Sequence, residues 1–168
     1  VLTLRATKVH DILVVLGHNA EEMRQKVSDL PATIVINPHY KQGQLSSLIA
    51  AIRHIESAGV GPDVDGILVH LVDHPFIDGK LVDLMLDKFH ETRKSIVVPT
   101  FGGRRGHPVI FSRDLFPEIL AAPLDQGAKA VVYAHRDDTL EIPTDYQGVT
   151  IDIDTPERLI SRHCPERT

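Results

Sequence analysis

Short apolar runs alternate with amphipathic segments along most of this chain. A run of apolar and β-branched residues that is bounded by Gly, Pro or Asn is typical of a buried strand. The runs at residues 12–16, 33–36, 67–72, 95–99 and 107–111 have this character, and shorter ones follow at 139–142 and 148–152. Each of these runs predicts a β-strand.

The segments between these runs predict helices. The clearest helix ends at Gly59, and its inner face carries Leu45, Leu48, Ile49, Ile52 and Ile55. A second helix begins near Asp78, with an inner stripe of Leu81, Leu84, Met85 and Phe89. Shorter helices are expected over residues 20–28, after Pro117, over 128–135 and after a Thr155 cap with Pro156, the first of them with Asn19 and Glu22 as a capping box.

Alternation of strands and helices is typical of α/β proteins. We therefore expect one domain over residues 1–168, with a doubly wound, mostly parallel sheet of the Rossmann-like kind. The connector at residues 100–106 is too short for a crossover helix. Residues 95–99 and 107–111 should therefore pair as an antiparallel hairpin insertion in that sheet.

Composition narrows the class of protein. The net charge of −5 argues against a non-specific nucleic-acid binder, which needs a basic surface. No apolar stretch reaches the roughly 20 residues that a membrane helix needs, and the first residues do not resemble a signal peptide. The single cysteine, Cys164, cannot form an internal disulfide. These features predict a cytoplasmic protein without a membrane or nucleic-acid partner.

Acidic side chains follow two of the predicted strands. The run before Asp73 stops at His74-Pro75, and the run before Asp152 and Asp154 stops at Thr155. Ligands of open α/β sheets bind beyond the carboxyl ends of the strands. If the two strands are neighbours, their carboxylates could hold a hard cation such as Mg²⁺. The alternative is that these residues only cap the turns that follow, although Asp78 and Thr155 are better placed as caps.

Other chemical signals are weaker. Residues 102–108 combine glycines with Arg104 and Arg105, which suits either phosphate contacts or a solvated hairpin loop. The ten histidines show no zinc-binding spacing, and His70, inside a predicted strand, is interpreted as a satisfied core histidine. No glycine-rich phosphate loop and no serine nucleophile elbow is present.

The ordered set of motifs resembles the MobA-like nucleotidyltransferases, and most closely their molybdenum cofactor cytidylyltransferase branch. The resemblance covers about residues 10–160. The matching stretches are residues 14–22, Asn37-Pro38 with 43–48, 71–75, 106–111, 125–128 and 152–157.

The resemblance implies roles for individual residues. Asp73 and Asp154 would be catalytic and would ligate Mg²⁺, with Asp152 beside them. The nucleotide-binding residues would be His18, Asn37, Ser46 and Ser47, and the acceptor-binding residues would be Gly106, His107, Pro108, Gln126 and Gly127.

One departure from the family concerns the start of the chain. Residues 1–9 read as the end of a helix already under way, so we expect the native polypeptide to extend beyond the printed residues. The family's first strand and its glycine-rich loop have no counterpart here. In the family that strand lies beside the strand ending at Asp73, and a chain without it would leave a buried strand edge unpaired.

The expected reaction is transfer of a nucleoside monophosphate, with CMP favoured, from a nucleoside triphosphate (CTP or GTP) to an acceptor phosphate with release of pyrophosphate. The acceptor would be a phosphorylated small molecule such as molybdopterin, with a molybdoenzyme client as a candidate protein partner. Two alternatives stay open. One is a different enzyme, either a methylerythritol phosphate cytidylyltransferase or a sugar-nucleotide pyrophosphorylase. The other is a non-catalytic nucleotide- or cofactor-binding protein.

Overall fold

The computed structural model describes residues 1–57 and 63–154. In chain order the elements are α1 (Leu2–Arg5), β1 (Leu13–Leu16), α2 (Ala20–Lys26), β2 (Thr33–Ile36), the 3₁₀ helix η1 (Tyr40–Gln42), α3 (Gln44–Ser57), β3 (Gly66–Val69), α4 (Gly79–Thr92), β4 (Ile96–Phe101), β5 (Arg104–Arg105), β6 (Val109–Ser112), η3 (Arg113–Leu115), α5 (Phe116–Ala121), α6 (Lys129–Ala134), η4 (Arg136–Asp138), β7 (Thr139–Pro143) and η5 (Gln147–Thr150).

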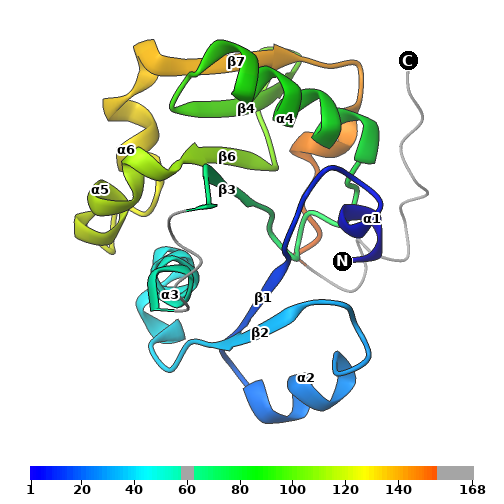
Figure 1. The fold of residues 1–168 in the computed structure, drawn as a ribbon, viewed down its shortest axis with the longest axis vertical. Coiled ribbons are helices and arrows are strands. Elements are labelled where there is room, and N and C mark those ends of the chain that lie inside the picture. The colour runs from blue at the N-terminus through cyan, green and yellow to red at the C-terminus, as the bar shows by residue number, and fades with distance from the viewer. Residues whose placement is uncertain (58–62, 155–168) are drawn as a thin grey trace.

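The described strands form two sheets. β1 and β2 pair in parallel, whereas a larger sheet has the order β3-β6-β4-β5, with β7 also pairing β4. In the larger sheet only β4 and β7 are parallel, and the β3–β6, β4–β6 and β4–β5 pairs are antiparallel. The α/β class is therefore confirmed. The described strands form one small parallel sheet and one larger mixed sheet (Figure 1), so the expected doubly wound, mostly parallel sheet is not confirmed.

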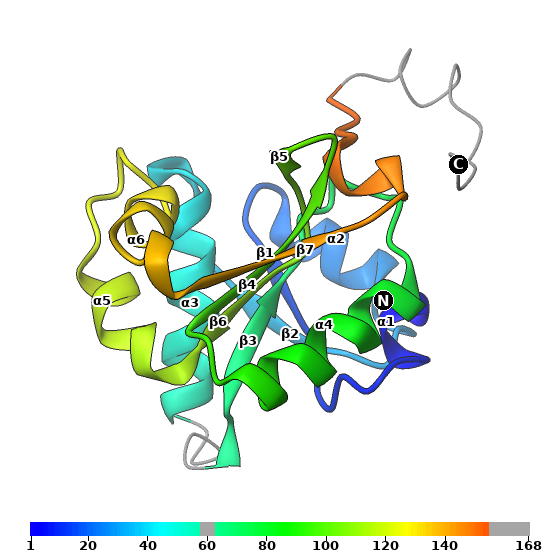
Figure 2. The same cartoon turned by 90° about the horizontal axis from the view of Figure 1, so that it is seen from above.

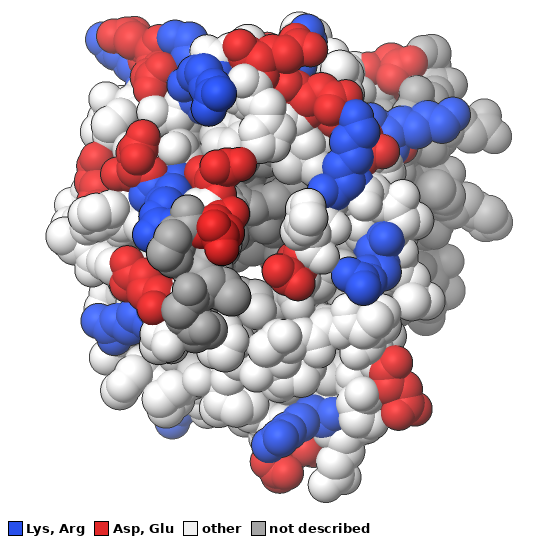
Figure 3. All heavy atoms as spheres, in the orientation of Figure 1, with Lys and Arg blue, Asp and Glu red and all other residues white. Residues whose placement is uncertain are grey.

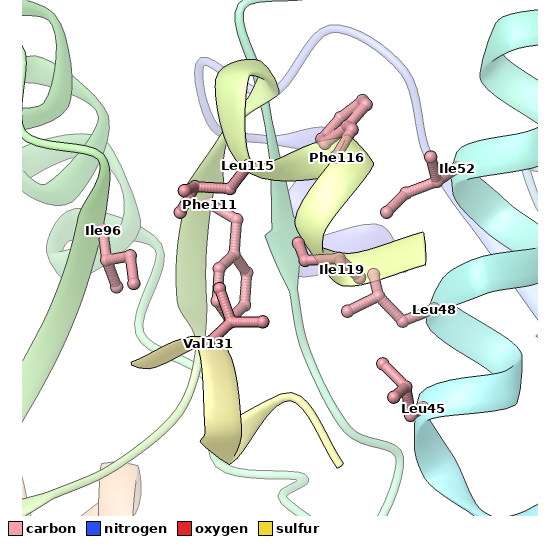
Figure 4. Close-up of a cluster of buried hydrophobic side chains, with 9 residues drawn as sticks. All are labelled: Leu45, Leu48, Ile52, Ile96, Phe111, Leu115, Phe116, Ile119 and Val131. Carbon is pink, nitrogen blue, oxygen red and sulfur yellow. The ribbon is translucent and has the colours of Figure 1, made fainter. Parts of the chain in front are cut away.

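Helices cover both faces of the larger sheet. Figure 2 shows α4 on one side, and α3, α5 and α6 on the other. The first core cluster joins α3 and α5 to the sheet through Leu48, Ile52, Phe111 and Ile119 (Figure 4). A second cluster on the α4 side includes Met85, which is fully buried. Burial of these apolar faces is the main driving force for the observed layers.

Many local predictions are confirmed. Helix α3 buries most of its predicted stripe. Helix α4 buries Leu81, Met85 and Phe89 as predicted, but Leu84 is 43% exposed and Val82 is buried in its place, so that part of the stripe was wrong. The Asp78 carboxylate caps α4 by accepting a hydrogen bond from the Lys80 amide at 2.9 Å. Pro117 lies in the first turn of α5. The antiparallel pairing of residues 95–99 with 107–111 is confirmed, since Ile96 pairs with Phe111.

Other local predictions are wrong. Asn19 precedes α2 with φ of 50° and makes no side-chain cap, so the capping box is absent. β3 ends at Val69 rather than at residue 72, and residues 147–150 form η5 instead of a strand. Short apolar runs are ambiguous because burial by tertiary contacts, not propensity, decides whether they pair as strands. Gly59 and the helix predicted after Thr155 lie outside the described residues.

The described helices and the surface charge can be compared with the composition. Within residues 1–57 and 63–154, each helix is too short or too polar to cross a membrane. Figure 3 shows acidic and basic side chains mixed over the face that it views, without a broad basic patch on that face.

Candidate functional site

Most of the candidate residues lie at the same ends of the strands. Figure 2 shows the ends of β1 and β3, the start of α3, the β5 hairpin and η5 on the same side of the molecule. The strand pairings explain this arrangement, since β6 runs antiparallel to β3 and therefore begins where β3 ends. His107 and Pro108, just before β6, are thereby placed near Asp73, which follows β3.

Asp73 is half-buried in the turn after β3. Its backbone carbonyl accepts a hydrogen bond from the Ile153 amide at 2.7 Å. Asp152 and Asp154 flank Ile153, so this bond brings the two acidic segments side by side although about eighty residues separate them in sequence. The Asp73 Oδ1 atom is buried and has no hydrogen-bond partner among the described residues. A buried carboxylate oxygen without a donor is suited to a cation.

Few side chains are available as ligands at the predicted metal site. Within the described ranges no group of three or more His, Cys, Asp or Glu side chains is arranged to hold a metal ion. Mg²⁺ often takes only one or two carboxylates, because substrate phosphates and water complete its octahedral shell. The unpartnered oxygen of Asp73, next to the segment that carries Asp152 and Asp154, fits that kind of site.

Gly106 and His107 are fixed by contact with the segment before Asp152. The His107 amide donates to the Val149 carbonyl at 2.8 Å. A Cβ atom at Gly106 would lie 2.2 Å from the same Val149 oxygen, so only glycine permits this approach. Pro108 is buried, and the bond that precedes it is cis. The predicted acceptor residues 106–108 therefore lie against the chain that leads to Asp152 and Asp154.

Three histidines, His70, His74 and His107, lie close to one another beside the Asp73 turn. The His74 and His107 rings lie 4.6 Å apart, and the buried Nδ1 atoms of His70, His74 and His107 have no hydrogen-bond partner among the described residues. His70 is thus not the satisfied core histidine that its position in a strand predicted. Sequence reasoning missed His74 as well, although its position next to Asp73 was an available signal.

Burial sets the charge of His70 and His107. It lowers the pKa of His70 from 6.5 to about 4, and the neighbouring His107 and His74 act in the same direction. Burial also lowers the pKa of His107, helped by His74 and opposed by the Asp73 carboxylate. Both rings are therefore neutral near pH 7, and each retains a buried nitrogen that can donate to or accept from a ligand.

Asn37 joins the end of β2 to the start of α3. Its side chain is buried, with 2 % exposure. The Nδ2 group donates to Ser46 Oγ at 2.8 Å and to Ser47 Oγ at 3.1 Å, and Oδ1 accepts from the His39 amide at 2.9 Å. The structure therefore brings Asn37, Ser46 and Ser47 together, and their mutual bonds hold this corner in place.

A cavity of about 500 Å³ adjoins this corner. It lies between the end of β2, α3 and the chain after α5, and it has an apolar wall that includes Leu124. Asn37 and Ser46 lie in its lining, with Gln42 and Arg53 as further polar side chains. A concave apolar space with a few polar groups is the usual form of a small-molecule site.

The remaining predicted residues are more peripheral. His18 is exposed, and its Nδ1 lies 3.3 Å from the Tyr40 hydroxyl, just before α3. Gln126 and Gly127 form a turn whose amides both donate to the Pro123 carbonyl. No hydrogen bond of the described residues joins that turn to Asp73 or to Asn37.

Several known proteins are similar to this chain in sequence or in fold. A molybdenum cofactor cytidylyltransferase from Escherichia coli is 23% identical over 156 residues, which cover 89% of this chain and 72% of that protein. A nicotine blue oxidoreductase from Paenarthrobacter nicotinovorans is 28% identical over 159 residues, covering 89% and 74%. The solved structure of Rv0371c from Mycobacterium tuberculosis in complex with manganese matches with a TM-score of 0.75 at 24% identity, covering 94% of this chain and 80% of that one.

These similarities agree with the motifs and with the fold. The family model described as the MobA-like NTP transferase domain matches residues 1–139. That match includes the Asn37 corner and the Asp73–His107 group. The chain belongs to the MobA-like NTP transferase family, a family of nucleotidyltransferases.

Proposed function

We propose that this protein transfers a nucleoside monophosphate, with CMP favoured, from a nucleoside triphosphate to the phosphate of a small-molecule acceptor. An acceptor phosphate oxygen forms a bond to the α-phosphorus, the bond between the α- and β-phosphates breaks, and pyrophosphate leaves. Phosphoryl-type transfers of this kind need little covalent help, and positioning and charge neutralisation supply most of the rate enhancement.

The observation that carries the proposal is the hydrogen bond from the Ile153 amide to the Asp73 carbonyl. It draws the acidic segment 152–154 to the turn that holds the unpartnered Asp73 oxygen. We assign Asp73 and Asp154 as the ligands of a divalent cation, with Asp152 beside them. Such an ion, when bound, would neutralise the α-phosphate and orient the acceptor oxygen. Similarity to a manganese-bound protein of the same fold is consistent with a divalent ion.

The histidine cluster would act on the acceptor side. His107 is neutral near pH 7, and its free nitrogen lies in a partly dry environment where one hydrogen bond counts for more than in water. Gly106 holds His107 against Val149 and so keeps the ring at a constant position. We assign residues 106–108 to acceptor binding, with His74 in contact with the His107 ring.

The nucleotide would bind at the part of the candidate site that the end of β2 and α3 form. The cavity next to Asn37 and Ser46 has room for a ring and offers the polar groups of Gln42 and Arg53. Asn37, whose side-chain bonds are internal, would position the start of α3 rather than contact the base. His18, Ser47, Gln126 and Gly127 stay as predicted contacts from the family resemblance.

Molybdopterin as acceptor is the finer part of the proposal. Two things support it: the Gly106-His107-Pro108 motif, and similarity to a molybdenum cofactor cytidylyltransferase. A molybdoenzyme client would follow from the same assignment.

The test is pyrophosphate release from CTP, GTP and UTP, with Mg²⁺ or Mn²⁺ and with molybdopterin as acceptor. Asp73→Asn should reduce turnover by about three orders of magnitude, the effect of losing a main electrostatic contributor. Asp11→Asn, an exposed carboxylate before β1, is the matched control and should retain full activity. Normal turnover in Asp73→Asn would contradict the assignment.

The same assay separates the alternatives. Turnover with methylerythritol phosphate or a sugar phosphate, but not with molybdopterin, would keep the reaction and change the acceptor. Saturable nucleotide binding without pyrophosphate release from any acceptor would instead indicate a non-catalytic binding protein.

A further inference from the structure

A second cavity lies at the opposite ends of the strands of the larger sheet. Its volume is about 340 Å³, and its lining comes from the residues before β3, the end of α4 and the end of β6. Asp73 follows the other end of β3, and His107 precedes the other end of β6. The lengths of β3 and β6 separate the cavity from the candidate site, so the two are distinct.

Among residues 1–57 and 63–154, no ion pair involves the two arginines that line this cavity. The Arg113 Nη1 atom is buried without a hydrogen-bond partner among the described residues. Arg93 is exposed at the end of α4, and no side-chain bond or ion pair of the described residues involves it. Lys94 differs, because its ammonium lies 3.5 Å from Asp138 and donates to the Asp137 carbonyl. A guanidinium that is withdrawn from water without a counter-charge is costly, and an anionic ligand would offset that cost.

The backbone at Arg93 adds an independent observation. Arg93 is the C-cap of α4 and has φ of 57°, in the left-handed region. Glycine is the usual residue at such a position, and a side chain there costs about 1 kcal/mol. Strained non-glycine residues concentrate at binding sites. Here the residue with the strained backbone is Arg93, which is cationic and lines the cavity.

The other lining residues define the shape and net charge of the site. Phe89 and Val64 supply an apolar wall. Asp65 and Asp114 are also present, and Asp65 lies 4.0 Å from His90 Nδ1. The lining carries Arg93, Lys94 and Arg113 against Asp65 and Asp114, a formal excess of one positive charge although the whole chain is acidic, and Lys94 is itself paired with Asp138.

We propose that this cavity binds a small organic anion, with a carboxylate or phosphate held by Arg93 and Arg113 and an apolar body against Phe89. Arginine forks suit both anionic groups, since both present paired oxygens. The volume is at the lower end of small-molecule sites, which limits the body to about one ring. Benzoate and inorganic phosphate are therefore suitable probes for the two anion types.

The experiment is a titration of the whole chain with each probe, followed by amide NMR shifts. Binding here should shift the amides of Asp65, Arg93 and Arg113 in a saturable way. Arg113→Gln and Arg93→Gln should each weaken binding by about tenfold or more, the loss of one charge-assisted hydrogen bond. Arg24→Gln, an exposed arginine of α2, is the matched control and should bind as the unaltered protein does.

A variant of the candidate site distinguishes the two proposals. Asp73→Asn should keep the binding of benzoate or phosphate at this cavity, even though we expect it to reduce transfer strongly. Shifts with benzoate alone or with phosphate alone would support the site and identify the anion type. Shifts confined to His107 and Ile153, no saturable shift with either probe, or unchanged affinity in both arginine variants would overturn the proposal. Arg93 is exposed, so its variant keeps the test valid if Arg113→Gln fails to fold.

Discussion

Gly106→Ala tests whether contact with Val149 shapes the candidate site. The new Cβ would lie 2.2 Å from the Val149 carbonyl oxygen, 2.7 Å from its carbonyl carbon and 2.9 Å from its Cβ. Two of these atoms belong to the backbone, so no side-chain rotation relieves the overlap. Either residues 105–107 or η5 must move, and movement breaks the 2.8 Å bond from the His107 amide to Val149.

The magnitude follows from two contributions. Overpacking in a well-packed region costs about 1–3 kcal/mol, and the lost hydrogen bond adds about 1 kcal/mol. The free energy of unfolding should therefore fall by about 2–4 kcal/mol. For a chain of this length each kcal/mol lowers Tm by about 2–4 °C, so a decrease of at least about 4 °C is expected.

The assay is urea denaturation followed by circular dichroism, together with pyrophosphate release under native conditions. Gly103→Asn is the control: Gly103 belongs to the same hairpin, has φ of 77°, which Asn tolerates, and has no atom within 4 Å of an added Cβ. The control should match the unaltered protein within about 0.5 kcal/mol, as surface substitutions usually do. A Gly106→Ala protein of unchanged stability and activity would refute the steric argument.

Three further outcomes follow from the described contacts. Asn37→Ala should lower the free energy of unfolding by about 2–4 kcal/mol, because it removes three hydrogen bonds and leaves the His39 amide without its acceptor, although the Ser46 hydroxyl keeps its bond to the Gly43 carbonyl; urea denaturation with an unchanged midpoint would contradict this. Because burial lowers the pKa of His70 from 6.5 to about 4, the unfolded chain binds a proton before the folded chain does, so stability should fall as pH falls from 6.5 towards 4. The decrease is at most about 3 kcal/mol and smaller after solvent screening of this half-buried ring, and His70→Gln should flatten the slope of stability against pH in that range. Arg93→Gly should raise the stability of the ligand-free protein by about 1 kcal/mol by relieving the left-handed backbone at φ of 57°; a lower Tm would mean that the arginine side chain stabilises the free protein.

The local pattern of the chain was sufficient for much of the architecture. Apolar spacing located α3 and α4, and the Asp78 cap and the place of Pro117 were read correctly. A connector of seven residues was enough to predict that β4 and β6 pair in antiparallel fashion. These features depend on neighbours within one or two turns, which the sequence shows directly.

Strand ends and pairings depended on contacts between distant segments. The final apolar run was expected to pair as a strand, yet residues 147–150 form η5, because Gly148 and Val149 pack closely against Tyr146 and Gly106. The two separate sheets were not foreseen either, since alternation of elements does not specify which strand edges meet.

For the candidate site, too, some features could be predicted from the sequence and others required the folded structure. The chain itself indicated acids after two strands, the Asn37 and Ser46 motifs, and the Gly106–Pro108 run, because those residue types and their order are visible in one dimension. Folding was needed to place Ile153 against Asp73, to bring three histidines together beside that turn, and to bury the Arg113 Nη1 atom without a hydrogen-bond partner among the described residues. Burial and hydrogen-bond partners are properties of segments that are remote in sequence, and only the packed chain brings those segments into contact.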